Sequence, residues 1–133
     1  MCSSDLFPDD VSTITKKKLM AGVLQRAKSY ADSQNIGFVV LIQPSQQDLT
    51  TNGPVDYVYL RDYDANYDPK ALTNAVQEIC SASEIHAIDL YDLFMENEPN
   101  ELYFLGDNNH WNDNGQDLAA KEAAAYIIEN GLF

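Results

Sequence analysis

Residues 36–42 are an unbroken apolar run, Ile-Gly-Phe-Val-Val-Leu-Ile, which constrains the fold more than any other stretch of the chain. A strand with one solvated face alternates apolar and polar side chains, whereas a continuous run of β-branched and aromatic residues is typical of a strand buried on both faces. Strands of that kind belong to parallel sheets that helices cover. We therefore expect residues 36–42 to form a buried strand of a parallel sheet, with ligands bound beyond its carboxyl end.

Helical periodicity precedes and follows this run. Residues 13–35 repeat apolar side chains at helical spacing, and residues 69–81 do so after Asp68, a natural cap, and Pro69, which fits a first turn. We predict a helix in each segment, and Cys80 as a small core residue. The predicted apolar positions are Leu19, Met20, Val23, Leu24, Ala27 and Tyr30 in the first helix, and Leu72, Val76, Ile79 and Cys80 in the second.

A second strand is predicted at residues 86–90, where His86 is expected to be structural or exposed and Asp89 to cap a short helix. The last helix is expected over about residues 113–130, with a glycine stop at position 131. Its predicted buried face consists of Leu118, Ala119, Ala123, Tyr126 and Ile127. Residues 46–68 are predicted to be irregular. Alternation of helices and buried strands indicates an α/β fold, with a parallel sheet and helices on both of its faces.

The composition limits the classes of function. At 133 residues the chain is long enough for one domain with a real core, and its net charge of −13 argues against binding the phosphates of nucleic acid. It has no apolar run of about 18 residues that would span a membrane, and no visible secretory signal. The two cysteines, Cys2 and Cys80, are too few for a disulfide framework, and we predict neither a cofactor nor a metal ion.

Residues 105–115, Leu-Gly-Asp-Asn-Asn-His-Trp-Asn-Asp-Asn-Gly, form a polar turn before the last helix and carry the strongest indication of chemistry. Asp107 and His110 are three residues apart, so in a turn their side chains can face the same way. A carboxylate bonded to one ring nitrogen fixes the tautomer and orientation that a histidine needs to accept a proton at the other. The helix would begin near Asn112 or Asp113, which seats the pair on the start of a rigid element.

Two other interpretations apply to this turn. Asp107 is also a common type of turn or cap residue, and an isolated histidine is often structural or exposed. A calcium loop is excluded by the spacing, because with Gly115 as its sharp-turn glycine a histidine stands where the first acidic ligand belongs. Lys121 then stands where the bidentate glutamate belongs.

The residues around the pair resemble the last conserved block of the SGNH (GDSL-type) hydrolases. That block has the pattern D-x-x-H, often followed by N-x-x-G and a helix of small residues. The His-Trp pair is also similar to the related acetyltransferase branch, of the alginate type, that modifies polysaccharides. The matching positions are Asp107, His110, Trp111, Asn112, Gly115, Ala119 and Ala120, and the resemblance is clearest over about residues 36–128.

The resemblance implies a flavodoxin-like three-layer αβα sandwich, of which this chain would hold only the C-terminal half. It also implies a serine nucleophile from an N-terminal Gly-Asp-Ser block, with His110 as general base and Asp107 as its orienting acid. Neither that block nor the family's glycine and asparagine blocks occur in these residues. Ser45 follows the first strand, but Pro44 precedes it and no Gly-x-Ser elbow surrounds it, so we do not expect it to be the nucleophile.

Residues 1–6, Met-Cys-Ser-Ser-Asp-Leu, look like the translation of the end of a common sequencing adapter. Our hypothesis is that the natural sequence starts at about Phe7, and that residues 7–133 are the C-terminal part of an SGNH hydrolase-like domain cut at a contig end. The alternative is an ordinary polar terminus. Under this hypothesis the lack of a signal peptide carries no information about localisation, and an extracytoplasmic full-length protein is compatible with the sequence.

Three classes of function follow. In the first, the chain contributes the histidine base and its aspartate partner to an acyl or acetyl esterase that acts on a small-molecule or carbohydrate ester. The second is a polysaccharide O-acetyltransferase of the same fold. The third is a non-catalytic α/β module in which Asp107 and His110 only cap the last helix. Release of free acetate, as against transfer to a glycan, separates the first two.

Because the nucleophile block is absent from these residues, we expect the 133-residue chain alone to show no serine-dependent esterase activity. The measurement is hydrolysis of an acetyl ester by the purified chain, compared with the spontaneous rate. Robust hydrolysis that depends on His110 would contradict this prediction.

Overall fold

The computed structural model describes residues 9–49, 67–104 and 110–132. In these ranges the chain forms five α-helices, one short 3₁₀ helix and two strands. The α-helices are α1 (Val11–Ser33), α2 (Gln46–Leu49), α4 (Ala71–Ala82), α5 (Tyr91–Glu96) and α6 (Asp113–Glu129), the 3₁₀ helix is η1 (Pro99–Glu101), and the strands are β1 (Val39–Ile42) and β2 (His86–Asp89).

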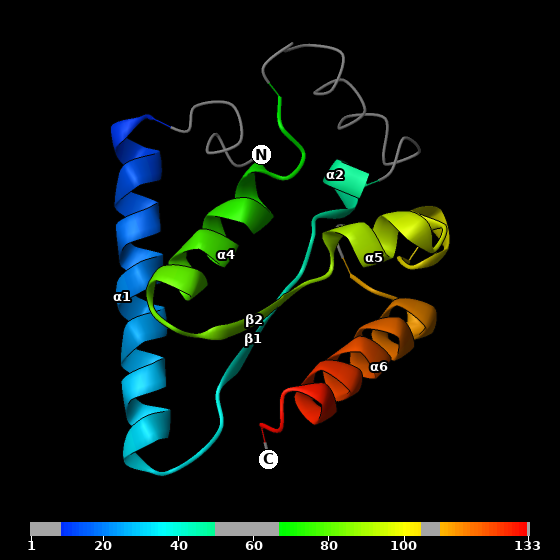
Figure 1. Cartoon of the computed structure of the whole chain (residues 1–133). Helices are drawn as coiled ribbons and strands as arrows, with labels where there is room; N and C mark the ends of the chain where they lie inside the picture. The colour runs from blue at the N-terminus through cyan, green and yellow to red at the C-terminus, as the bar shows by residue number, and fades with distance from the viewer. Residues whose placement is uncertain (1–8, 50–66, 105–109, 133) are drawn as a thin grey trace.

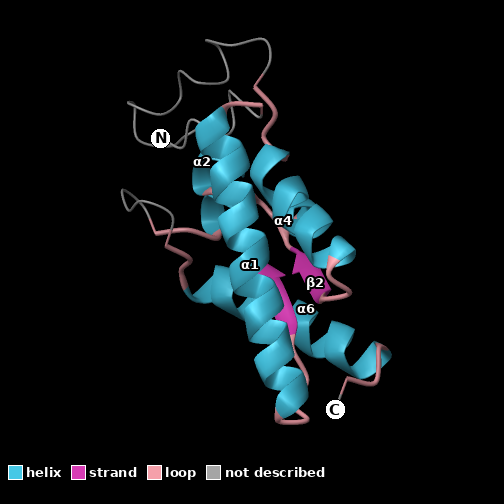
Figure 2. Cartoon of the chain, turned by 90° about the vertical axis from the view of Figure 1, so that its left-hand side faces the viewer, coloured by secondary structure: helices cyan, strands magenta, loops and turns pink. Residues whose placement is uncertain are grey.

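The two strands pair in parallel, with Val39 opposite His86 and Ile42 opposite Asp89. The amide of Leu90 donates to the carbonyl of Ile42 (3.2 Å), so the ladder ends at the same level in both strands. Figures 1 and 2 show α1 and α4 side by side along one side of this pair, and Figure 1 shows α6 on the other side. The predicted α/β fold, with a parallel sheet between helices, is confirmed.

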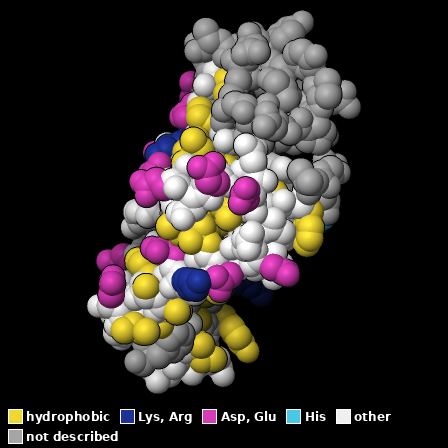
Figure 3. Space-filling view, turned by 90° about the vertical axis from the view of Figure 1, so that its right-hand side faces the viewer, with side chains coloured by type: hydrophobic (Ala, Val, Ile, Leu, Met, Phe, Trp, Pro, Cys, Tyr) yellow, Lys and Arg dark blue, Asp and Glu magenta, His cyan; other side chains and the backbone are white. Residues whose placement is uncertain are grey.

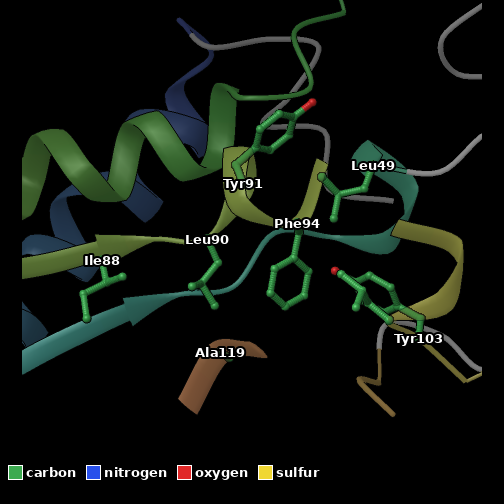
Figure 4. Close-up of a cluster of buried hydrophobic side chains, with 8 residues drawn as sticks. Leu49, Ile88, Leu90, Tyr91, Phe94, Tyr103 and Ala119 are labelled. Atoms are coloured by element: carbon green, nitrogen blue, oxygen red, sulfur yellow. The ribbon is translucent and has the colours of Figure 1, made fainter. Parts of the chain in front are cut away.

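The core is an apolar cluster that joins β2, α2, α5, α6 and the segment after η1. Phe94 is fully buried in it, and Figure 4 shows its ring between Leu90 and Tyr103, with Ala119 of α6 beneath. The ring of Tyr103 meets it edge to face at 6.1 Å, and the ring of Trp111 lies 5.2 Å away at a tilt. The cluster consists of Leu49, Ile88, Leu90, Tyr91, Phe94, Leu102, Tyr103 and Ala119.

The expectation that residues 36–42 are buried on both faces is wrong for this structure. Ile36 lies before the strand and is exposed, and Leu41 within it is 39% exposed, whereas its neighbour Ile42 is buried. Successive side chains of a strand point to opposite faces, and Ile42 points to the side where Leu72 of α4 lies. On the α6 side the apolar cluster forms around Ile88 of β2, and Leu41 is not part of it.

The first predicted helix is present as α1, but its predicted apolar face is not buried. Leu19 is 69% exposed and Val23 56% exposed, while the buried residues are Thr13 and Ala31. The physical reason is that α1 and α4 do not close on each other along these positions. They leave a groove of about 480 Å³, which Leu19, Met20 and Val23 line together with Leu72, Ala75, Val76 and Ile79 of α4.

The other helices lie close to their predicted positions. Helix α4 begins at Ala71, two residues later than predicted. Asp68 accepts a hydrogen bond from the amide of Lys70 (2.9 Å) in the preceding turn, and it does not cap the helix itself. Cys80 is fully buried, as predicted, and burial raises the pKa of its thiol. Helix α6 ends before Gly131, whose φ of 60° is the left-handed conformation expected of a glycine stop.

The prediction that residues 46–68 are irregular is wrong at its start, because α2 occupies Gln46–Leu49. The hydroxyl oxygen of Ser45 accepts a hydrogen bond from the amide of Gln47 (3.3 Å), and the carbonyl of Ser45 accepts one from the amide of Asp48 (3.0 Å). Ser-x-x-Asp is a helix-start pattern that the sequence displays at positions 45–48. Residues 50–66, and the predicted artefact at residues 1–6, lie outside the described residues.

Helix α6 is brought against the segment after η1 by a backbone contact that only glycine permits. A Cβ atom on Gly115 would lie 2.4 Å from the carbonyl oxygen of Leu102, whereas a Cβ atom on Gly22 in α1 would meet nothing within 4 Å. Gly115→Ala is expected to lower the free energy of unfolding by about 1–3 kcal/mol, because the backbone has to move apart.

The matched control is Gly22→Ala, which is expected to raise the free energy of unfolding by up to about 1 kcal/mol. The reason is that alanine has a higher helix propensity than glycine at an exposed position inside a helix. Urea denaturation followed by circular dichroism measures both variants. Equal stability of Gly115→Ala and the unmodified chain would contradict the close contact.

Candidate functional site

His110 lies on a short antiparallel pairing that leads directly into α6. Its carbonyl accepts a hydrogen bond from the amide of Phe104 (3.1 Å), and Tyr103 and Trp111 form a bridge. The amide of Asn112 donates to the carbonyl of Leu102 (3.0 Å). We call residues 102–104 and 110–112 the histidine hairpin. Residues 105–109, which include Asp107, lie outside the described residues, so the pairing of Asp107 with His110 stays a prediction.

Asn112 holds this hairpin to the start of α6 with all the polar atoms of its side chain. Its Oδ1 accepts hydrogen bonds from the amides of Asn114 (2.9 Å) and Gly115 (3.2 Å), which caps the helix. Its Nδ2 donates to the carbonyls of Glu101 (2.7 Å) and Tyr103 (3.1 Å). The predicted helix start near Asn112 is confirmed. One side chain therefore binds the helix N-terminus and the neighbouring strand at the same time.

Tyr103 connects the histidine hairpin to the end of β1. Its side chain is buried, and its hydroxyl donates a hydrogen bond to the carbonyl of Pro44 (3.0 Å), 59 residues away in the sequence. Burial raises the pKa of Tyr103 far above its ordinary value, so its hydroxyl remains a donor at physiological pH. The hairpin and the segment after β1 are thus joined by a hydrogen bond inside the core.

The segments joined in this way border an open cavity of about 550 Å³ beyond the carboxyl end of β1. This is the position at which parallel sheets bind ligands. The exposed residue His110 lies on its wall, which Leu72 and Val76 of α4 also line. The described residues that line the cavity are Ile42, Gln43, Pro44, Ser45, Asp48, Leu72, Thr73, Val76 and His110.

Ser45 and Asp48 bring further polar groups to this cavity. Ser45 accepts the hydrogen bond that starts α2, as described above, and it shares the cavity wall with His110. Asp48 is 5% exposed and accepts a hydrogen bond from the hydroxyl of Tyr67. Asp48 was not predicted from the sequence, although its position three residues after Ser45 is a helix-start signal that places a carboxylate just after the strand.

The two remaining candidates have structural roles. His86 is exposed at the beginning of β2, as predicted, and its Nδ1 lies 3.2 Å from the hydroxyl of Tyr126. It stands at the end of the strand opposite to the cavity. Asp89 accepts a hydrogen bond from the amide of Tyr91 (2.9 Å), the first residue of α5, although Leu90 and not Asp89 occupies the N-cap position.

The described ranges give no support for other types of site. Within residues 9–49, 67–104 and 110–132, no three His, Cys, Asp or Glu side chains are grouped closely enough to hold a metal ion. None of the helices in these ranges combines the length and apolar character needed to cross a bilayer. On the face shown in Figure 3, acidic side chains are spread among apolar and uncharged ones, with few Lys or Arg side chains.

Comparison with known proteins gives one match to a family. The model of a family described as the SGNH hydrolase-like domain of the acetyltransferase AlgX matches residues 6–132. No curated protein and no solved structure matches the chain significantly. The matched range includes β1, β2, the histidine hairpin and the cavity-lining residues.

The bonds of Asn112 predict an unusual outcome for Asn112→Asp. Aspartate is an equally good helix cap, but it has no amide protons and would place an oxygen against the carbonyls of Glu101 and Tyr103. We expect the free energy of unfolding to fall by about 1–3 kcal/mol, measured by urea denaturation. The control is Asn74→Asp on the exposed side of α4, which is expected to change stability by less than about 0.5 kcal/mol. Unchanged stability of Asn112→Asp would show that its two donated bonds contribute nothing.

Proposed function

Because the chain belongs to the SGNH hydrolase-like family of the acetyltransferase AlgX, we propose that it supplies the proton-transfer part of an acyl-transfer site. In this proposal His110 is the general base, and Asp107 is the acid that orients its ring. The observation that carries the proposal is the position of His110, an exposed imidazole on the wall of a cavity beyond the strand ends. The main chain around His110 is held by two hydrogen bonds to the facing segment, from the amide of Phe104 to the carbonyl of His110 and from the amide of Asn112 to the carbonyl of Leu102.

The chemistry of such a site follows from the properties of imidazole. His110 takes the proton of a serine hydroxyl as the serine oxygen attacks the carbonyl carbon of an acetyl ester. The tetrahedral intermediate collapses, the bond to the leaving alcohol breaks, and His110 returns the proton to that alcohol. A second alcohol, or water, then gives its proton to His110 as its oxygen attacks the acetyl carbonyl carbon. The bond between the acetyl group and the serine oxygen breaks, and His110 passes the proton to that serine oxygen. We propose that this serine is supplied by residues other than these 133.

The family supports transfer of an acetyl group to a carbohydrate hydroxyl over simple hydrolysis, because the matching model is that of an acetyltransferase. The cavity provides both kinds of surface that a sugar ester needs. Leu72 and Val76 form an apolar side, while Gln43, Asp48 and Thr73 provide hydrogen-bonding groups. Hydrolysis is the second candidate, since water takes the place of the acceptor alcohol in the same mechanism.

The arrangement of α6 argues against the non-catalytic interpretation of the turn. In that interpretation Asp107 and His110 only cap the last helix. Asn112 occupies the cap position, and its Oδ1 accepts hydrogen bonds from the amides of Asn114 and Gly115. The imidazole of His110 lies instead on the cavity wall, so its position is not explained by a capping role.

The test uses the full-length protein that contains these residues, with an acetylated donor and a glycan acceptor. His110→Gln is expected to lower kcat/KM by about 10²–10⁴-fold, because the general base is lost. His86→Gln is the matched control, since His86 is the other histidine of the chain and lies away from the cavity, and its activity should stay within about twofold. Free acetate and acetylated glycan are quantified separately.

Two results would contradict the proposal. If His110→Gln keeps its activity, His110 is not the base. If Ser45→Ala removes activity, the nucleophile is Ser45 on the cavity wall rather than a serine from outside this sequence.

A further inference from the structure

We propose that Tyr103 is the positioning residue that sets where His110 stands relative to the cavity wall. The inference rests on the proposed role of His110 as general base, and it concerns a residue that is not itself on the cavity wall. The backbone of Tyr103 is part of the histidine hairpin, and its side chain is hydrogen-bonded to the segment after β1. Tyr103 therefore connects the hairpin that carries His110 with the segment that lines the other part of the cavity.

The backbone of Tyr103 belongs to the hairpin that carries His110. Tyr103 bridges Trp111, the residue that follows His110, and its carbonyl accepts a hydrogen bond from Nδ2 of Asn112. The next residue, Phe104, donates its amide to the carbonyl of His110. A displacement of Tyr103 is therefore transmitted to the main chain of His110 through a short, hydrogen-bonded pairing.

The side chain of Tyr103 is attached to the opposite wall. Its hydroxyl donates to the carbonyl of Pro44, and Pro44 is fully buried while lining the cavity between β1 and α2. Tyr103 is 2% exposed, so water has little access to replace this hydrogen bond. The edge-to-face contact with Phe94 fixes the direction of the ring. The side chain of Tyr103 therefore sets the distance between Pro44 and the hairpin.

A second tyrosine provides a matched comparison. The hydroxyl of Tyr91 donates to the carbonyl of Asp48 (3.4 Å), and Tyr91 is 6% exposed. Both tyrosines therefore anchor residues 44–48 through a backbone carbonyl from within the same apolar cluster. Tyr91 belongs to α5, whereas Tyr103 belongs to the histidine hairpin. If Tyr103 only stabilised the core, removal of either hydroxyl would have the same effect on His110.

The experiment records the imidazole signals of the ¹⁵N-histidine-labelled 133-residue chain by long-range ¹H–¹⁵N NMR. The chain has two histidines, so each spectrum contains the signal of His110 and an internal reference from His86. Tyr103→Phe is expected to move or broaden the His110 signals and to change its tautomer ratio, with His86 unchanged. Tyr91→Phe should leave both histidines in place. Tyr126→Phe, which removes the hydroxyl next to His86, should move His86 alone.

Loss of stability is separated from loss of position by repeating the Tyr103→Phe measurement in the Gly22→Ala background, for which we expect added stability. In the full-length enzyme, Tyr103→Phe should lower kcat about tenfold to a hundredfold with KM within about twofold, because misplacement of a base affects proton transfer more than binding.

The proposal is overturned if Tyr103→Phe leaves the His110 signals unchanged, or if Tyr91→Phe moves them equally. Since the NMR measurement needs no turnover, it is independent of the proposed function. Full activity of His110→Gln would refute the proposed function while leaving the positional result to be decided by the spectra.

Discussion

The burial of Phe94 is the interaction on which the described structure depends. Its ring lies where β2, α5, α6 and the histidine hairpin meet, and it contacts the rings of Tyr103 and Trp111. Truncation of a fully buried phenylalanine typically costs about 3–5 kcal/mol, which is a large part of the stability of a domain of this size. A pair of four-residue parallel strands has little stability of its own, so the cluster around Phe94 holds the sheet as much as the sheet holds the cluster.

The geometry of the candidate site depends on the packing of this cluster. Tyr103 takes part in the apolar packing through its ring and in the site through its hydroxyl, which reaches Pro44 at the cavity. Asn112 and Gly115 then fix the direction in which α6 leaves the hairpin, one by its four hydrogen bonds and the other by permitting close contact with Leu102. The position of His110 is therefore a consequence of core packing, although its own side chain is exposed.

The sequence predicted those features that local chemistry determines. Helical spacing located α1, α4 and α6, and the apolar runs located both strands. The cap role of Asn112 and the bond of Asp89 to the first amide of α5 followed from their side chains. Periodicity states which side of an element is apolar, but not whether another element covers it. For that reason the exposure of Leu19 and Leu41 was not predictable. The Ser-x-x-Asp pattern could have located Asp48, but not its burial, because its partner Tyr67 is 19 residues away and no local pattern connects the two.

The same distinction explains why the site was only partly predictable. The D-x-x-H pattern named His110, but the bond between Tyr103 and Pro44 joins residues that are 59 positions apart, and no spacing rule relates them. A general base has to be accessible to the hydroxyl from which it takes a proton, and it also has to be held within a hydrogen bond's length of that hydroxyl. Burial of the imidazole would satisfy the second requirement at the expense of the first. If His110 is the base that we propose, different parts of one hairpin would meet the two requirements, because the main chain is hydrogen-bonded and Tyr103 is buried while His110 is exposed at the cavity. Under the proposed role of His110, this division would place the determinants of its position in residues that do not line the cavity.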